Sequence, residues 1–163
     1  MEYAVIFLPL FGTIIGYLSK YFGDMTSQLI TTVSVCLSAV LSIIIFYNGV
    51  INNGYGNYLI YEWISSGDFQ ANWSINIDPL SSIMLVVVTL VSALVHIYSI
   101  GYMSHDPNKP RFMSYLSLFT FSMLVLVVSD NFLQLFFGWE GVGLSSYLLI
   151  GFWYKKNSAN KAA

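Results

Sequence analysis

The sequence predicts an all-α membrane protein with about five transmembrane helices and an extracytoplasmic β-hairpin between the second and the third helix. Of its 163 residues 56% are apolar and 9% are charged, whereas about 25% of the residues in a soluble domain are charged. Five apolar runs reach or approach the length of about 20 residues that an α-helix needs to cross a bilayer. Composition and run length therefore agree on a polytopic membrane chain.

The apolar runs set the predicted boundaries. They are Tyr3–Leu18, Gln28–Tyr47, Leu80–Gly101, Phe112–Val128 and Phe132–Trp153. The predicted segments are the first two helices (1–47), a polar loop (48–78), the third and fourth helices (79–128), the fifth helix (129–154) and a basic tail (155–163). Glu2 stands where a secretory signal has a basic residue, so we expect the first run to be a retained helix.

The polar loop at residues 48–78 has the features of a hairpin. Its first part holds the turn dipeptides Asn-Gly and Gly-Asn, beginning at Asn48. Tyr58–Ile64 and Phe69–Ile77 are β-prone and partly alternating, with a polar turn between them. Asp78 and the following proline then predict an N-cap and a first helical turn, where the missing proline N–H is harmless.

All basic residues lie on one side of this predicted topology. They are Lys20, Lys109, Arg111, Lys155, Lys156 and Lys161. Positive charge collects on the cytoplasmic side of membrane proteins. We therefore expect the N-terminus and the hairpin to face outward, and the tail to face the cytoplasm or the mitochondrial matrix.

Several functional classes are excluded by composition. A net charge of −2 provides no basic face for nucleic acid. Cys36 is the single cysteine, and one thiol forms neither an internal disulfide nor, alone, a zinc or iron–sulfur site. The glycines of residues 138–143 have neither dinucleotide nor P-loop spacing, and they favour close helix–helix packing instead. Any redox cofactor is therefore expected on another chain.

Glu140 is the leading candidate for a functional residue. It lies ten residues beyond Asp130, which with Asn131 precedes the fifth run as a candidate N-cap. Helical rise places Glu140 about 15 Å into a hydrocarbon layer about 30 Å thick. A charge there costs about 2.5–3.5 kcal/mol on insertion scales, which points to proton handling. The alternative is a protonated carboxyl that is hydrogen-bonded to a neighbouring helix. No Lys or Arg lies within the predicted spans, so an ionised Glu140 needs a cation from elsewhere.

His96 is the second candidate. Thr89, Ser92, His96 and Ser99 follow one another at spacings of three and four residues, and therefore share one face of the third helix. One interpretation is a proton relay in which His96 titrates. The other is an interhelical hydrogen-bond seam that fixes packing. The sequence alone does not choose between them.

Three motifs resemble the antiporter-like subunit 5 family of complex I, NADH:quinone oxidoreductase, named subunit L in bacteria. They are residues 139–152 (Trp-Glu-Gly-Val-Gly-Leu-Ser-Ser-Tyr-Leu-Leu-Ile-Gly-Phe), residues 95–103 (Val-His-Ile-Tyr-Ser-Ile-Gly-Tyr-Met) and residues 77–81 (Ile-Asp-Pro-Leu-Ser). Their order and spacing also match, and the resemblance covers essentially the whole chain. Ser145 stands where the family pattern has cysteine.

The resemblance implies a role for both candidates. In that family a fifth-helix glutamate pairs with a lysine on a later broken helix and helps to drive proton translocation, a role that falls on Glu140. The family's third-helix histidine corresponds to His96. The implied partners are other membrane subunits of complex I and the lipid bilayer, in a bacterial plasma membrane or a mitochondrial inner membrane. FMN, iron–sulfur clusters and quinone are implied on partner subunits, with none bound by this chain.

Length is the main departure from the family. Its members have more than a dozen spans, and these 163 residues correspond to the amino-terminal quarter. The sequence is compatible with a truncated product, one piece of a split subunit or part of a longer record. Two alternative functions also remain: the large subunit of a multisubunit cation/proton antiporter, and a non-catalytic fragment with a packing or assembly role. In every case the partner lysine lies outside these residues.

Overall fold

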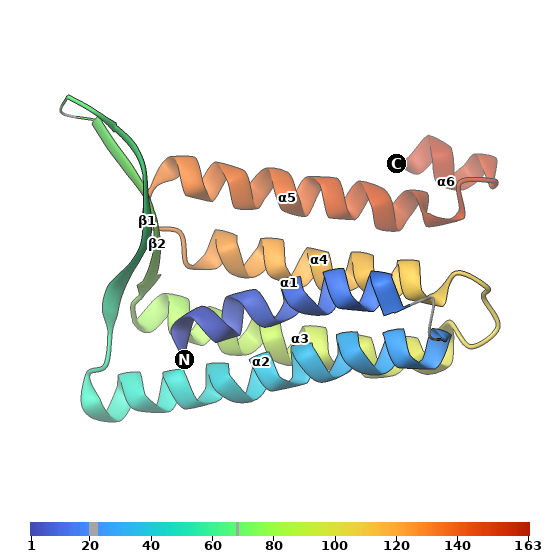
Figure 1. The fold of residues 1–163 in the computed structure, drawn as a ribbon, viewed down its shortest axis with the longest axis horizontal. Helices are drawn as coiled ribbons and strands as arrows, with labels where there is room; N and C mark the ends of the chain where they lie inside the picture. The colour runs from blue at the N-terminus through green and yellow to red at the C-terminus, as the bar shows by residue number, and fades with distance from the viewer. Residues whose placement is uncertain (20–22, 68) are drawn as a thin grey trace.

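Helices running side by side, with a two-stranded hairpin across one end, make up the computed structural model (Figure 1). The structure describes residues 1–19, 23–67 and 69–163. Its elements are α1 (Glu2–Leu18), α2 (Asp24–Asn52), β1 (Gly56–Ser66), β2 (Phe69–Ile77), α3 (Pro79–Tyr102), α4 (Lys109–Val127), α5 (Phe132–Ile150), the 3₁₀ turn η2 (Gly151–Trp153) and α6 (Asn157–Ala162). The helical chain with one hairpin agrees with the predicted fold class.

Four helical segments of the described chain are long and apolar enough to cross a membrane. They are α2, α3, α4 and α5 extended through Trp153. The predicted first span forms α1, a shorter apolar helix of 17 residues that rises about 25 Å. Four of the five predicted spans therefore meet the length criterion, and a crossing by α1 stays a prediction.

The interior of the bundle formed by α1 to α4 is lined by hydroxyl side chains. The buried ones include Ser27, Thr31, Ser34, Ser38, Ser42, Ser82, Thr89, Ser99, Ser114, Ser117 and Thr120. Large apolar side chains such as Leu37, Val91 and Leu94 point outward. Lipid tails are as apolar as leucine, so helices in a bilayer associate through small side chains and interhelical hydrogen bonds. The distribution is therefore the one expected for a membrane bundle.

Pro9 interrupts the backbone hydrogen bonds of α1, and the neighbouring helices compensate. Because proline has no N–H, the carbonyl of Val5 lacks its usual partner four residues later. The Ser38 hydroxyl of α2 donates to that carbonyl. The Pro9 carbonyl in turn accepts from Ser117 Oγ of α4 at 2.8 Å and from Thr13 Oγ1 at 2.9 Å. The two carbonyls around the proline of α1 are therefore hydrogen-bonded to serines of α2 and α4.

The second helix runs past its predicted end at Tyr47. It continues to Asn52, and Asn53 ends it in the left-handed region with φ of 49°. The predicted turn at Asn48 is instead helical. A Cβ at Gly49 would lie 2.5 Å from the ring of Tyr55, so this glycine makes room for a side chain that folds back onto the helix.

The predicted hairpin is present. The antiparallel register runs from Gly56 opposite Ile77 to Ser66 opposite Phe69, with irregularities between Leu59 and Tyr61 and between Glu62 and Ile64. Ile75 and Ile77 of β2 enter an apolar cluster with residues of α1 to α4. Tyr3 Oη donates to the Leu59 carbonyl at 3.2 Å, which places the start of α1 beside the hairpin.

Asp78 caps α3 as predicted. Ser81 N–H donates to Asp78 Oδ1 at 2.6 Å, and Asp78 N–H donates to Ser81 Oγ at 2.8 Å, which forms a capping box. Hydrogen bonds from the Ser81 backbone N–H and from its hydroxyl lower the pKa of Asp78. Pro79 is the first helical residue.

The described basic residues gather at the end of the bundle away from the hairpin. Lys109 and Arg111 lie in the first turn of α4, and Lys155, Lys156 and Lys161 follow α5 (Figure 1). Lys20, which belongs to the predicted basic set, lies outside the described residues. The separation of hairpin and basic end is structural, whereas the side of the membrane that each faces stays a prediction.

Candidate functional site

Small residues hold the helix that carries Glu140 against α4. A Cβ at Gly138 would lie 2.7 Å from the backbone N of Leu126 and 2.8 Å from its Cα. A Cβ at Gly141 would lie 2.8 Å from Ser122 Oγ. Ser145, one turn beyond Gly141, is also buried. The close helix–helix contact expected from the glycines of residues 138–143 is therefore confirmed at Gly138 and Gly141, whereas Gly143 has nothing described within 4 Å of its Cβ position.

The hairpin fixes the beginning of α5. The Asn131 side chain accepts from Gln134 N–H at 2.9 Å, which confirms it as the N-cap, and its amide donates to the Asn72 carbonyl at 2.7 Å. Gln134 is buried and exchanges two hydrogen bonds with the backbone of Ser74. Ser74 N–H donates to its Oε1 at 3.1 Å, and its Nε2 donates to the Ser74 carbonyl at 2.8 Å.

Asp130 does not share the capping role that the sequence suggested for it with Asn131. Its Oδ2 accepts from Asn57 Nδ2 at 2.6 Å and from Ser74 Oγ at 3.1 Å. The carboxylate therefore joins β1 and β2 to the turn before α5. Sequence reasoning placed Asp130 by its local position, but its hydrogen-bond partners are 56 and 73 residues away.

Glu140 lies on the open side of α5. Its side chain is exposed, as are Phe136, Leu144 and Tyr147 around it. In the described chain, no hydrogen bond or ion pair reaches its carboxylate. The alternative prediction was a protonated carboxyl that is hydrogen-bonded to a neighbouring helix. No helix among the described residues makes that hydrogen bond. Any partner of Glu140 has to approach the face of α5 that is opposite α4.

His96 is fully buried within the bundle. Its Nδ1 lies 2.8 Å from the Ser92 carbonyl on the same helix. The hydroxyls beside it cross between helices: Ser92 Oγ bonds Thr120 Oγ1 of α4, and Thr89 Oγ1 lies 2.7 Å from Ser42 Oγ of α2. The hydrogen-bond seam expected on this face is therefore present at Thr89 and Ser92. A titrating role for His96 remains a separate proposal.

The structure keeps the two candidates apart. His96 points into the bundle formed by α2, α3 and α4, whereas Glu140 points away from α4. In the part of the chain that the structure describes, α5 packs against α4 and touches β2, η2 and α6. A direct proton transfer between His96 and Glu140 has no support in this arrangement.

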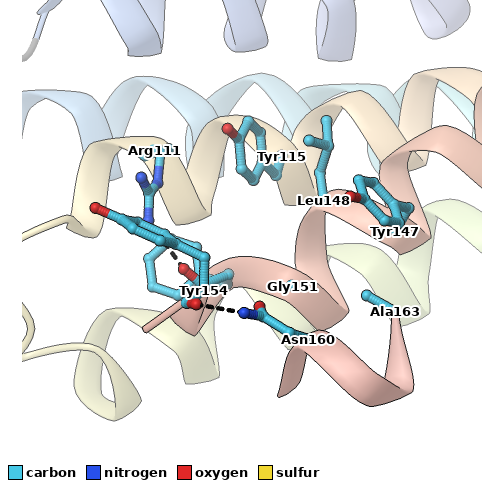
Figure 2. A pocket seen from close by; sticks show the side chains of 9 residues that line it. Arg111, Tyr115, Tyr147, Leu148, Gly151, Tyr154, Asn160 and Ala163 are labelled. Atoms are coloured by element: carbon cyan, nitrogen blue, oxygen red, sulfur yellow. Dashed lines mark hydrogen bonds between the residues drawn. The ribbon is translucent and has the colours of Figure 1, made fainter. Parts of the chain in front are cut away.

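A pocket at the basic end was not predicted from the sequence. It encloses about 290 Å³, and Arg111, Tyr115, Tyr147 and Tyr154 are among the residues that line it (Figure 2). Arg111 Nη2 donates to the Phe152 carbonyl at 3.0 Å, and the guanidinium lies 4.7 Å from the ring centre of Phe152. These contacts join the start of α4 to the 3₁₀ turn η2 that follows α5. Among the described residues, no three His, Cys, Asp or Glu side chains gather into a group that could hold a metal ion.

Comparisons with known proteins agree with these features. Residues 63–113 match the family model described as NADH-ubiquinone oxidoreductase (complex I), chain 5 N-terminus. Residues 129–163 match the model described as NADH:quinone oxidoreductase/Mrp antiporter, TM.

Curated relatives extend the match over the chain. NADH-ubiquinone oxidoreductase chain 5 of Arabidopsis thaliana is 51% identical over 100% of this chain and 24% of its own length. The same chain of Phytophthora infestans is 54% identical over 98% of this chain and 24% of its own length. NADH-quinone oxidoreductase subunit L of Rickettsia conorii is 55% identical over 98% of this chain and 24% of its own length.

The span-length apolar helices, the hydroxyl-lined interior and the match to an antiporter transmembrane model define a polytopic membrane protein of the antiporter-like class. Within that class, the chain belongs to the family of complex I chain 5, or subunit L. It spans about a quarter of the length of the curated relatives that it matches.

Proposed function

We propose that the chain forms the amino-terminal part of a proton-translocating, antiporter-like subunit of NADH:quinone oxidoreductase. The observation that carries this proposal is Glu140 on the open face of a span-length helix, with no partner in the described chain. A carboxylate at that depth is stable when a cation or a hydrogen-bonding group faces it. The family resemblance supplies such a group as a lysine on a later helix.

The proposed chemistry at Glu140 is reversible protonation. With the lysine ammonium close by, the carboxylate is favoured, and when the lysine is neutral or distant the carboxyl retains a proton. Phe136, Leu144 and Tyr147 surround Glu140 with apolar surface, so its charge depends strongly on that single neighbour. A movement of charge along later helices would thus load or release one proton here.

The subunit's setting follows from the same proposal. Electron transfer from NADH to quinone on other subunits provides the driving free energy, and those subunits hold FMN, iron–sulfur clusters and quinone. The other membrane subunits and the lipid bilayer are the proposed partners. We also propose that α1 crosses the membrane, with the hairpin outward and the basic end in the bacterial cytoplasm or the mitochondrial matrix, because basic residues favour that side.

The test is the number of protons translocated per NADH oxidised in membrane vesicles with the assembled enzyme. Glu140→Gln is expected to lower this ratio, because the amide cannot take up or release a proton. Glu62→Gln is the matched control, since Glu62 is an exposed carboxylate on β1, outside the spans. An unchanged ratio in Glu140→Gln contradicts the proposed role.

A cation/proton antiporter subunit is the second candidate, because the family model over residues 129–163 names both kinds of protein. The match of residues 63–113 to a complex I model favours the first candidate. Purification of the tagged subunit under native conditions separates the two. Recovery of flavin and iron–sulfur subunits supports complex I, and recovery of antiporter subunits alone supports the second candidate.

A further inference from the structure

A cavity opens at the basic end of the bundle between the start of α2 and the end of α3. It has a volume of about 350 Å³, and Asp24, Gln28, Ile100, Ser104 and Lys109 are among its lining residues. Lys109 Nζ lies 3.9 Å from Asp24 Oδ2, and the Asp24 side chain is 45% exposed. The mouth of this cavity therefore carries charged groups in contact with solvent.

Polar atoms without partners continue inward from this cavity. Gln28 is 6% exposed, Thr32 7% and His96 0%. Within the described residues, Gln28 Nε2, Thr32 Oγ1 and His96 Nε2 are buried and have no hydrogen-bond partner. Two further atoms on α4, Arg111 Nε and Ser114 Oγ, are also buried without a hydrogen-bond partner. A buried polar atom left unpaired costs about 1–3 kcal/mol, so three on adjoining helix surfaces indicate a shared polar ligand.

The face of α2 that holds Gln28 and Thr32 is the face that packs on α3. Residues 28, 32, 35, 39 and 42 follow one another at spacings of four and three, which keeps them on one side of a helix. Ser42 of this set bonds Thr89 of α3, and Val35 and Ala39 cluster with Ala93. Gln28 and Thr32 continue this face toward the cavity.

Helix geometry brings the unpaired atoms to neighbouring levels. The 2.7 Å contact between Ser42 and Thr89 sets the register of α2 against α3. At about 1.5 Å per residue, Thr32 lies about 15 Å and His96 about 10 Å from that level, both toward the basic end. Their depths thus differ by about 5 Å, which is about one helical turn. Gln28 lies one further turn outward and lines the cavity.

We propose that water fills a path from the cavity at Asp24 and Lys109, past Gln28 and Thr32, to Nε2 of His96. On its other side, His96 Nδ1 bonds the Ser92 carbonyl and lies 3.4 Å from the Ser92 hydroxyl, which in turn bonds Thr120 Oγ1. The path is separate from the face of α5 that carries Glu140. A part for His96 in proton transfer rests on the proposed function, but the presence of water along the path does not.

Cysteine labelling in native membrane vesicles of known orientation, holding the assembled enzyme, tests this path. In a Cys36→Ser background, Thr32→Cys and, separately, Val33→Cys are treated with a charged, water-soluble thiosulfonate. Val33 is the neighbouring residue of α2 and is 52% exposed on the outer surface of the bundle. Thiosulfonates react with the thiolate, which forms in water and not in lipid, so position 32 is expected to react at least tenfold faster, and from the basic end.

Gln28→Phe provides the second arm, because a larger apolar side chain at the cavity floor should slow labelling at position 32 and leave position 33 unchanged. Ser99→Cys, a near-isosteric change at a buried position of α3 at a similar depth, repeats the test if Thr32→Cys fails to assemble. Equal rates at positions 32 and 33, or a rate at position 32 that Gln28→Phe does not alter, overturn the proposal. Labelling rates do not depend on proton pumping. A result against the water path can therefore be told apart from a result against the proposed role of Glu140.

Discussion

Gln134 and Ser74 exchange two hydrogen bonds, at 3.1 and 2.8 Å, across 60 residues of sequence. The Gln134 amide pairs with the N–H and C=O of one residue on the edge of β2 that faces away from β1, as a neighbouring strand would. On the same edge, Asn76 N–H donates to the Val128 carbonyl at 2.9 Å. The hairpin and the first turn of the Glu140 helix are therefore one hydrogen-bonded unit.

Gln134→Leu is expected to loosen this unit. Leucine leaves the Ser74 N–H and carbonyl unpaired in a buried position, at a cost of about 1–3 kcal/mol. Hydrogen exchange in peptides that cover β2 should become faster. Gln134→Glu can serve both Ser74 groups only as the protonated acid, so its effect should be smaller than that of Gln134→Leu at low pH. If both variants exchange like the parent protein, the pairing does not hold β2 in place.

Gly138→Ala is expected to push α5 away from α4. The added Cβ would meet backbone atoms of Leu126 at 2.7 and 2.8 Å, which cannot rotate aside as a flexible side chain can. Overpacking of this kind costs about 1–3 kcal/mol. Gly143→Ala is the matched control, because nothing described lies within 4 Å of its Cβ position. The free energy of unfolding in mixed micelles is the measurement, and equal effects of both substitutions would argue against the close contact.

Residues such as Asp78, Gly138 and Gln134 show which features were accessible from sequence. Asp78-Pro79 predicted a helix start because capping depends on neighbouring residues alone. The small residues near Gly138 predicted close packing because a helix surface without side chains lets another helix approach. The Gln134 pairing and the partners of Asp130 depend on tertiary contacts that no local pattern encodes. A glutamine in the first turn of an otherwise apolar helix was the available signal, since a buried amide requires partners. The Asn48-Gly49 dipeptide wrongly predicted a turn, because Gly49 lies within a helix and makes room for the ring of Tyr55.

The position of Glu140 near the middle of its helix was accessible from sequence, but its exposure was not. Counting helical residues from Asp130 placed Glu140 near the middle of the span. Which face it occupies depends on how Gly138 and Gly141 pack against α4. The unpaired Nε2 of His96 likewise emerged only from the packing of three helices.

Ser38→Ala is expected to destabilise the bundle through the Val5 carbonyl that Pro9 leaves without a helical partner. Interhelical hydrogen bonds in membranes contribute about 0.6–1.7 kcal/mol, so a cost in that range is expected. In a Pro9→Ala background the restored N–H can bond the Val5 carbonyl, and the same serine substitution should then cost less. A double-mutant cycle of unfolding free energies measures the difference. Identical costs in both backgrounds would show that Ser38 does not compensate for the proline.

Asp78 is expected to make the start of α3 sensitive to acid. Its pKa is lowered in the folded protein, first by the Ser81 backbone N–H and then by the Ser81 hydroxyl. The carboxylate therefore contributes stability above its ordinary pKa of about 3.9, and this contribution is lost as the pH falls through the lowered folded value. Asp78→Asn retains a capping acceptor without titrating, so the pH dependence of Ser81 amide protection should flatten. A slope that persists in Asp78→Asn would assign the effect to another group.

We propose that Glu140 changes its protonation state while the assembled enzyme works. Infrared difference spectra between the oxidised and the NADH-reduced enzyme report carboxyl groups that gain or lose a proton. We expect a carbonyl-stretch signal of a protonated carboxyl that disappears in Glu140→Gln and remains in the Glu62→Gln control. An identical carboxyl signal in the parent enzyme and in Glu140→Gln would show that Glu140 does not change its protonation state.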